Sequence, residues 1–368
     1  NCIKLIYIIF LGGYKMMRLT ALRTILDEND IDGILITNGI NRRYLTGFTG
    51  SAGTVLVTKT AAHLLVDSRY ITQASNQAKD FTVIEINRNL FFEEIVNIVK
   101  RMGVNKLGFE QKHISFYEHS QLCEYLPVEL VPLSGVVEKM RTIKTEDEIT
   151  LIKIAAEISD SAFAHILSVI RAGMTEIEIA NELELHMRKL GATSSFDMII
   201  ASGLRSALPH GVASEKVIES GDIVTLDFGA YYKGYCSDMT RTIAVGEPSL
   251  QIKEIYSIVN RALENALNGI KAGIRGKEAD ALTRDVINEA GYGSFYGHGT
   301  GHGIGLYIHE DIFMSSTCED FVEAGMVLTV EPGIYIPGVG GVRIEDDIII
   351  RENGIETITK SSKELIII

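Results

Sequence analysis

The sequence of 368 residues contains no tryptophan, only six prolines and only four cysteines. The cysteines form no CxxC pair, which argues against both a zinc knuckle and a disulfide framework. They are Cys2, Cys123, Cys236 and Cys318. No apolar run reaches the about 18 residues that a membrane-spanning helix needs, so we expect no membrane partner. Scattered reduced thiols are typical of a cytoplasmic protein.

Basic charge is in short supply, since 35 Lys and Arg residues face 48 Asp and Glu residues, for a formal net charge of −13. A nucleic acid or an anionic membrane would need a basic face, so we expect neither as a partner. The apolar share of 46% and the charged share of 23% are ordinary for a globular protein. At about 100–200 residues per domain, the length predicts two domains, with three as the alternative. The composition therefore favours a soluble, acidic, intracellular enzyme.

The first residues differ from the rest of the chain. An apolar run at 5–11 is followed by a Gly-Gly-Tyr-Lys segment and by Met16 and Met17. No small-residue cleavage site of a signal peptide precedes Arg18. We expect translation to begin naturally at one of the two methionines, and residues 1–17 to be a non-native or disordered extension. The alternative is a short hydrophobic anchor.

Residues 18–138 alternate between helical and strand patterns, which predicts one α/β domain. Helical spacing is found at 19–26 and 92–102. The predicted strands are short apolar runs at 34–37, 54–58, 62–67 and 106–110. The alternation ends near Pro132 and Gly135. Thr145, followed by three acids, then begins a long helical pattern, so we predict a second domain over residues 139–368.

The second domain contains a weak internal repeat. An Ile-basic-Ala-Gly tetrapeptide at 170–173 recurs at 270–273. In a longer repeated segment further along the chain, Asp227 and Glu331 occupy matching positions. Two copies are too few for a solenoid. We therefore predict two related α+β halves around a pseudo-twofold, with the two matched acids close together at the centre.

Two acids flank a predicted hairpin. Asp227 ends an apolar strand, and Asp238 follows after a turn at Lys233 and Gly234, so both carboxylates can project into one space. A buried acid at a strand end needs a metal, an arginine or backbone N–H groups as partners. Either acid alone would more simply be a surface or turn aspartate.

Three of the nine histidines lie within twelve residues, in a segment where glycines let the backbone pass close to a ligand. They are His298, His302 and His309. This grouping favours a binding role over a structural one. Further on, Glu331 and Glu345 both lie at the ends of apolar strands, although Glu345 could instead form a salt bridge with Arg343.

The order of these residues resembles the five-ligand dinuclear metal centre of the pita-bread metallopeptidases, which include methionine aminopeptidases, aminopeptidase P and prolidase. The motifs are Leu226-Asp-Phe-Gly, Ser237-Asp-Met-Thr-Arg, His298-Gly-Thr-Gly-His-Gly-Ile-Gly-Leu, Glu331-Pro-Gly-Ile-Tyr and Arg343-Ile-Glu-Asp. The resemblance covers residues 18–368. It implies a creatinase-like N-terminal α/β domain and an α+β pita-bread catalytic domain. Methionine aminopeptidases generally lack the first domain, which favours the creatinase, aminopeptidase P and prolidase branch.

The resemblance also implies a role for each motif residue. The metal ligands would be Asp227, Asp238, His302, Glu331 and Glu345. They would hold two divalent ions, Mn²⁺ first and Co²⁺ or Zn²⁺ as alternatives, because structural Zn²⁺ favours thiolates over oxygen-rich ligands. The catalytic residues would be His210, His309 and Glu331, with Glu331 accepting the proton of the attacking water and the histidines donating hydrogen bonds. The substrate-binding residues would be His298, Tyr335 and Arg343.

A peptidase of this kind would hydrolyse the Xaa-Pro bond at the N-terminus of proline-containing peptides, as a cytoplasmic homodimer. A prolidase must bind the terminal carboxylate of a dipeptide, most simply through a cation. No Lys or Arg occurs between Arg284 and Arg343, so we expect an aminopeptidase P, with prolidase as the alternative. A cation from the N-terminal domain of a neighbouring subunit, such as Arg42, Arg43 or Arg69, would favour prolidase instead. A non-hydrolytic pita-bread protein is the remote alternative.

Overall fold

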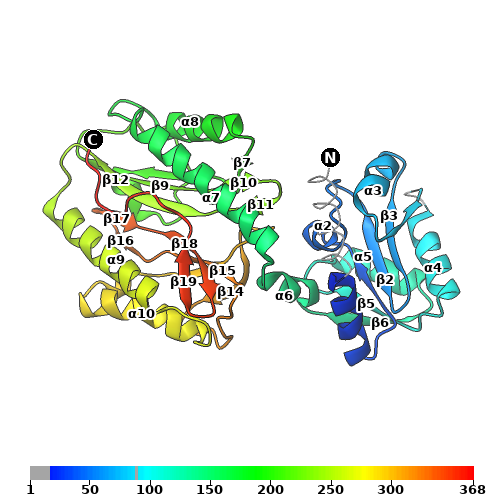
Figure 1. Cartoon of the computed structure of the whole chain (residues 1–368). Helices are drawn as coiled ribbons and strands as arrows, with labels where there is room; N and C mark the ends of the chain where they lie inside the picture. Colours follow the sequence, from blue (N-terminus) through cyan, green and yellow to red (C-terminus); the bar gives the residue numbers. More distant parts are fainter. Residues whose placement is uncertain (1–16, 88–89) are drawn as a thin grey trace, which may run out of the picture. The chain divides into compact units, whose positions relative to one another are not determined.

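The computed structural model describes residues 17–87 and 90–368 (Figure 1). The chain divides into two compact units, Asn1–Arg141 and Thr142–Ile368. Apart from Met17, the extension expected over residues 1–17 lies outside the described residues. The domain boundary expected between residues 138 and 139 falls inside helix α6 (Val136–Thr142) and stays a prediction.

The first unit is built on a mixed sheet of six strands in the order β4-β3-β2-β1-β5-β6. The strands are β1 (Gly33–Ile36), β2 (Thr54–Thr58), β3 (Ala62–Val66), β4 (Thr82–Glu85), β5 (Lys106–Glu110) and β6 (Glu129–Leu133). β1 pairs antiparallel with β2 and parallel with β5. Every residue of β1, β2 and β3 is buried, which explains their continuous apolar sequences.

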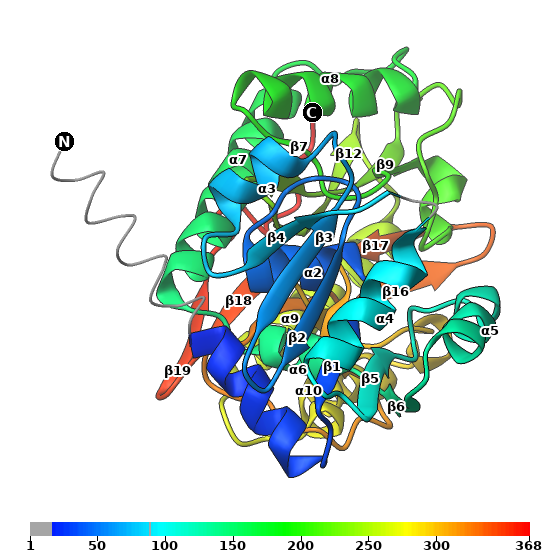
Figure 2. The ribbon, with the colours of Figure 1, turned by 90° about the vertical axis from the view of Figure 1, so that its right-hand side faces the viewer.

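Helices lie around this sheet (Figure 2). Residues 17–28 are helical, and the later helices are α2 (Gly39–Thr46), α3 (Ile71–Gln77), α4 (Phe91–Arg101) and α5 (Phe116–Tyr125). α4 buries Ile95, Ile98 and Val99 in a core that also contains Leu35 and Leu56 of the sheet. The predicted α/β class of this domain is therefore confirmed.

Four helices cover the strands of the second unit. They are α7 (Glu146–Leu167), α8 (Glu176–Lys189), α9 (Leu250–Gly269) and α10 (Gly276–Glu289). Figure 1 shows α7 and α8 on one side of the strands and α9 and α10 on the other. Thr145 and Thr175 begin α7 and α8 with capping boxes, each closed by a glutamate three residues later.

The two helix pairs repeat the same local structure. Gly173 and Gly273 both adopt positive φ angles, of 93° and 91°, in the turn before the second helix of each pair. That turn requires a conformation that glycine adopts without steric cost. α8 and α10 are both 14 residues long. The predicted duplication within an α+β domain is confirmed in this arrangement.

The strands of the second unit form several groups. One sheet has the order β12-β9-β8 and consists of β8 (Ile199–Ser202), β9 (Asp222–Phe228) and β12 (Met239–Val245). Another has the order β14-β13-β15-β18-β19 and consists of β13 (Gly301–Gly303), β14 (Glu310–Met314), β15 (Val327–Val330), β18 (Asp346–Arg351) and β19 (Gly354–Thr357). The smaller groups are a ribbon of β16 (Gly333–Ile336) and β17 (Gly340–Arg343), and a sheet of β7 (Thr193–Ser194), β10 (Ala230–Tyr232) and β11 (Tyr235–Cys236).

The hairpin expected between Asp227 and Asp238 is present. β10 pairs antiparallel with β11 across a two-residue turn. Lys233 and Gly234 form this turn with φ angles of 49° and 101°, the conformation that matches the twist of a tight hairpin. As a result, Asp227 near the end of β9 and Asp238 just before β12 lie at the same end of an antiparallel pair.

Each half of the second unit has its own apolar core. One core packs α7 and α8 against the β12-β9-β8 sheet and includes Phe163 and Phe228. The other packs α9 and α10 against the five-stranded sheet and includes Leu263 and Ile348. A fully buried side chain of this kind contributes about 1.5–3 kcal/mol, so both cores give the strands a stable support. Within residues 17–87 and 90–368, no helix combines the length and apolar character that crossing a membrane requires.

Candidate metal centre and active site

The five predicted metal ligands lie at or near strand ends of the second unit, and all five line one pocket of about 450 Å³. Two come from the first half of the unit and three from the second. They are Asp227 in β9, Asp238 before β12, His302 in β13, Glu331 after β15 and Glu345 before β18. The structure thus brings together residues that are spread over more than one hundred positions of the sequence.

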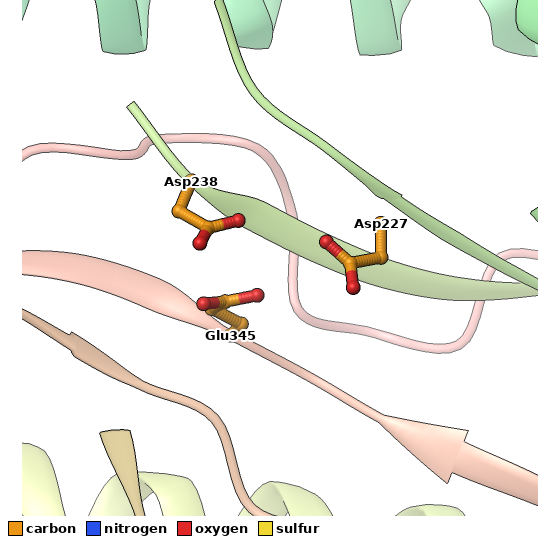
Figure 3. A group of neighbouring side chains, drawn as sticks. All are labelled: Asp227, Asp238 and Glu345. Atoms are coloured by element: carbon orange, nitrogen blue, oxygen red, sulfur yellow. The ribbon is translucent and has the colours of Figure 1, made fainter. Parts of the chain in front are cut away.

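Three of these residues form a tight carboxylate cluster. Asp227, Asp238 and Glu345 each place an oxygen within 4.8 Å of the others, and the carboxylates point toward one another (Figure 3). Burial raises the pKa of Asp238, and the nearby charge of Glu345 raises it further. Burial likewise raises the pKa of Glu345, together with the charges of Glu331 and Asp227. Without a cation, these groups therefore favour the protonated state.

The cluster has the properties of a divalent metal site. Asp238 Oδ1 is buried and has no hydrogen-bond partner in the described part of the chain. An unpaired buried oxygen of this kind is costly unless a cation binds it. Carboxylate-rich ligand sets suit hard divalent ions. The donor set therefore fits the predicted metal.

Neighbouring groups orient the carboxylates. The Thr240 hydroxyl donates to Glu345 Oε2 at 2.6 Å. The backbone N–H of Asp238 donates to Asp347 Oδ2 at 2.9 Å. Arg343 forms an ion pair with Asp227, not with Glu345, which was the salt bridge considered from the sequence. Such outer contacts hold metal-binding side chains in one orientation.

His302 faces Glu331 and Asp238. Its Nε2 lies 3.5 Å from Glu331 Oε1 and 3.8 Å from Asp238 Oδ2. Its Nδ1 lies 3.1 Å from the Gly303 carbonyl oxygen, so the proton belongs on Nδ1 and the Nε2 lone pair faces the acids. Burial lowers the pKa of His302 to about 4. A neutral imidazole with this tautomer is the form that binds a metal.

Glu331 is half-buried and has a nearly neutral pKa. Its Oε1 accepts a hydrogen bond from the Thr329 hydroxyl at 3.2 Å. Burial raises its pKa to about 7, against the opposing charge of Arg343. A carboxyl group with a pKa near the working pH can both accept and return a proton. These properties are those required of the proposed proton acceptor.

The three predicted substrate-binding residues form one hydrogen-bonded chain. Arg343 Nη1 donates to the Tyr335 hydroxyl at 2.7 Å, and that hydroxyl lies 2.9 Å from His298 Nε2. His298 Nδ1 lies 2.8 Å from the Gly299 carbonyl oxygen, so Nε2 is the acceptor of the Tyr335 proton. Burial raises the pKa of Tyr335 to about 12 and lowers that of His298 to about 4. His298 and Arg343 line the pocket, whereas Tyr335 is buried and connects them.

His210 and His309 line the same pocket. Both are exposed, and no hydrogen bond to either ring is found among the described residues. The His309 ring packs edge-on against His302, with 4.6 Å between ring centroids. Burial lowers the pKa of His309, and the nearby His210 lowers it further. The lowered pKa favours the neutral imidazole at His309, and both rings are accessible groups in the pocket of the metal ligands.

Several residues that line the pocket, or that hold its acids in place, were not predicted from the sequence. The largely apolar wall includes Phe196, Ile199, Val212, Ile308, Phe313 and Met314, with the exposed Asp197 among them. Arg241 is buried and donates to Asp346 at 2.7 Å and to the Glu345 carbonyl oxygen. The three successive acids at 345–347 were the sequence signal for the contacts of Arg241. Nothing in the local sequence marked the apolar wall.

Comparison with known proteins gives a consistent result. The chain matches Metallopeptidase family M24 over residues 150–352 and the Creatinase/Prolidase N-terminal domain over residues 18–143. The solved structure of an Xaa-Pro dipeptidase from Bacillus anthracis is 58% identical, with a TM-score of 0.94, over 96% of this chain and 100% of that chain. An X-Pro aminopeptidase structure from Thermotoga maritima MSB8 is 42% identical, with a TM-score of 0.87, over 92% and 98%. An Xaa-Pro dipeptidase from Pyrococcus furiosus is 41% identical over 95% of this chain and 99% of its own length.

Proposed function

This chain belongs to metallopeptidase family M24, and from that premise we propose that it is an Xaa-Pro dipeptidase, a prolidase. The family and the branch inferred from the motifs are confirmed, and the chain is a metallo-exopeptidase of the Xaa-Pro type. The observation that carries the choice of dipeptidase is the 58% identity to the Bacillus anthracis Xaa-Pro dipeptidase along almost the whole chain. The Thermotoga maritima X-Pro aminopeptidase supports aminopeptidase P as the second candidate.

This choice reverses the order expected from the sequence, where aminopeptidase P came first. That expectation used the lack of a Lys or Arg between Arg284 and Arg343. The relatives named as dipeptidases speak against it. Physically, a carboxylate can also be bound by imidazole or backbone N–H groups, or by a cation distant in sequence. Of the cations suggested for that role, Arg42 is buried and donates to the carbonyl oxygens of Gly50 and Gly53.

Peptidases of this family act with divalent metal ions, and the carboxylate cluster fits them. We infer two ions, with Mn²⁺ as the first choice and Co²⁺ or Zn²⁺ as alternatives. The ligands would be Asp227, Asp238, His302, Glu331 and Glu345. When bound, the ions supply an activated water and polarise the scissile carbonyl.

The chain's own residues supply the remaining steps. Glu331 accepts the proton of the attacking water and passes it to the leaving proline nitrogen. His210 and His309 donate hydrogen bonds to the oxygen on which negative charge develops. His298 lines the place of the proline ring, and the Tyr335 and Arg343 contacts hold it there. The apolar wall keeps bulk water away from the reacting groups.

The substrate test compares an Xaa-Pro dipeptide with an Xaa-Pro-Yaa tripeptide. The Mn²⁺-loaded protein and an EDTA-treated control are assayed side by side for release of the first residue. A prolidase cleaves the dipeptide in a metal-dependent way and leaves the tripeptide nearly intact. The opposite preference would identify an aminopeptidase P. Failure to cleave either peptide with any of the three metals would refute the proposed function.

We further propose that the protein acts as a cytoplasmic homodimer. The dimer is implied by the family resemblance, and the location is supported by the free thiols of Cys123, Cys236 and Cys318. Light scattering measures the oligomer directly. A dimer gives twice the mass of one chain, and a single-chain mass would contradict the proposal.

A further inference from the structure

A buried ion pair lies next in sequence to His309, a residue that lines the pocket. Lys144 Nζ is 3.2 Å from Glu310 Oε2, and the two side chains are only 2% and 3% exposed. Lys144 lies just before α7, and its backbone N–H donates to the Gly325 carbonyl oxygen at 2.9 Å. Its ammonium also donates to the Thr142 carbonyl oxygen at 3.1 Å. The cation is therefore held in one place from several directions.

The Glu310 carboxylate organises the segment of residues 305–309. Its Oε1 accepts a hydrogen bond from the backbone N–H of Tyr307 at 3.2 Å. At Gly305, a Cβ atom would lie only 2.8 Å from this carboxylate, so a larger residue there would displace the Glu310 side chain. The Gly305 carbonyl oxygen in turn accepts from the N–H of Cys236 at 2.8 Å. The segment is thus wrapped around the carboxylate.

This segment carries His309, the residue that precedes Glu310. No hydrogen bond to the His309 ring is found in the part of the chain that the structure describes, and the ring packs against the rings of His302 and Tyr307. Its position therefore depends on the backbone on either side of it. Ile308 is buried on one side and Glu310 on the other. The backbone of Glu310 is paired with Gly303 of β13, and the ion pair with Lys144 anchors its side chain in addition.

We propose that Lys144 and Glu310 are positioning residues, which hold the His309 imidazole at the distance from the metal ligands that catalysis needs. The role rests on the proposed function, since His309 acts only if the pocket cleaves peptides. A buried ion pair is a weak source of stability, because desolvation offsets most of its attraction. Its place beside a histidine with no hydrogen bond of its own points to orientation instead.

The test uses the Lys144→Met and Glu310→Gln variants of the metal-loaded full chain. We expect kcat on the cleaved Xaa-Pro peptide to fall about 10- to 100-fold, because small misplacements of a catalytic group cost this much. KM and bound metal should stay as in the unchanged protein. Lys144→Arg keeps the cation and should restore most of kcat. Lys153→Met, which removes an exposed ion pair with Glu356, is the matched control and should leave kcat unchanged.

A double variant separates positioning from a general loss of structure. In a chain that already carries His309→Ala, adding Lys144→Met should lower kcat by less than threefold, since the histidine to be positioned is gone. If the two effects multiply instead, Lys144 does not act through His309 and the proposal is overturned. An unchanged kcat in both Lys144→Met and Glu310→Gln would overturn it as well.

An NMR measurement tests the inference independently of activity. In the Zn²⁺-loaded protein with ¹⁵N-labelled histidine, Glu310→Gln should shift the ring signals of His309 and leave those of His165 and His186, on α7 and α8, in place. If the unchanged protein cleaves no peptide but the His309 signals shift, the proposed function fails, and only the structural link between the ion pair and the His309 ring stands. If the peptide is cleaved and the His309 signals stay in place, the positioning role fails alone.

Discussion

Among single residues, the side chain of Asp238 has the properties of a metal ligand. It is buried, one of its oxygens has no hydrogen-bond partner within the described residues, and its pKa is raised by burial and by the charge of Glu345. Asp227 has the charge of Arg343 beside it, but no cationic side chain is found beside Asp238 in the same part of the chain. A divalent cation would supply the missing charge.

We predict that Asp238→Asn abolishes tight metal binding and lowers peptide hydrolysis by at least about 1,000-fold, because a neutral amide replaces a charged ligand. The metal-free variant should be at least as stable as the unchanged metal-free protein, since one of the repelling carboxylates is removed. Calorimetric titration with Mn²⁺ and thermal unfolding check the two parts.

The matched control for that experiment is Asp197→Asn. Asp197 is an exposed acid of the same pocket and lies outside the proposed ligand set. The Asp197→Asn variant should bind Mn²⁺ as the unchanged protein does. Equal losses of metal in the two variants would contradict the ligand assignment.

Tyr335 tests the hydrogen-bonded chain behind the pocket. Tyr335→Phe removes the hydroxyl that links Arg343 to His298 and leaves both groups without that partner. Because an unpaired buried polar group costs about 1–3 kcal/mol, we predict a fall in kcat/KM of about 10- to 100-fold with metal content unchanged. Steady-state kinetics and metal analysis measure both quantities. Loss of metal in this variant would mean that Tyr335 supports the metal centre rather than the substrate.

At the scale of the elements, the site depends on how closely β9 and β12 approach each other. Gly229 follows β9, and a Cβ atom there would overlap the carbonyl oxygen of Ser237, next to Asp238. Only glycine allows the two aspartate-bearing segments to come this close.

We predict that Gly229→Ala lowers the free energy of unfolding by about 1–3 kcal/mol, the usual cost of overpacking, and weakens Mn²⁺ binding as well. Denaturant unfolding and calorimetric titration are the measurements. The control is Gly297→Ala, where an added Cβ atom meets nothing within 4 Å. A Gly229→Ala variant with normal stability and metal affinity would show that the close approach is not needed.

Buried strands could be predicted from the sequence, and partly exposed strands could not. β1, β2 and β3 are buried along their whole length, and each was expected from an apolar run. β4 and β6 are partly exposed and gave no such run, so they were missed. α2, α3 and α5 are short and bury few apolar residues, which leaves no clear helical period in their sequences.

In the candidate site, some residues could be predicted from the sequence and others could not. Asp227, Glu331 and Glu345 could be picked out because each polar residue interrupts an apolar strand pattern. The pair of Lys144 and Glu310 could not be found in this way. It joins residues far apart in sequence whose proximity arises only from the packing of the second unit. Long-range polar contacts of this kind follow from tertiary structure rather than from local pattern.

At the scale of the whole molecule, the repeat explains why one site is formed from two halves. Each half contributes a helix pair with its own core, and the acids at matching positions, Asp227 and Glu331, line the same pocket. Because acids from both halves gather in this pocket, the stability of the chain depends on pH and on bound metal.

We predict that the contribution of Glu331 to the stability of the metal-free protein falls as pH rises from about 4.5 to 7. The pKa of Glu331 is 4.5 when unfolded and about 7 when folded, so in this window the folded chain holds a proton that the unfolded chain has released. Stability therefore falls with rising pH, by up to about 3 kcal/mol from this group. Below pH 4.5 both states are protonated and the contribution is fully present.

Denaturant unfolding at several pH values with EDTA measures this slope. Glu331→Gln should flatten it, and saturating Mn²⁺ should remove it, because the metal takes the place of the proton. If the unchanged protein and Glu331→Gln had the same dependence of stability on pH in EDTA, the raised pKa would be contradicted.

Five side chains of the second unit are proposed to bind two divalent ions. Anomalous diffraction from crystals of the Mn²⁺-loaded protein, recorded at the manganese edge, would locate these ions. We expect two peaks, each in contact with carboxylates from the set Asp227, Asp238, Glu331 and Glu345, and one of them also with His302. Peaks elsewhere in the chain, or an empty carboxylate cluster at saturating Mn²⁺, would contradict it.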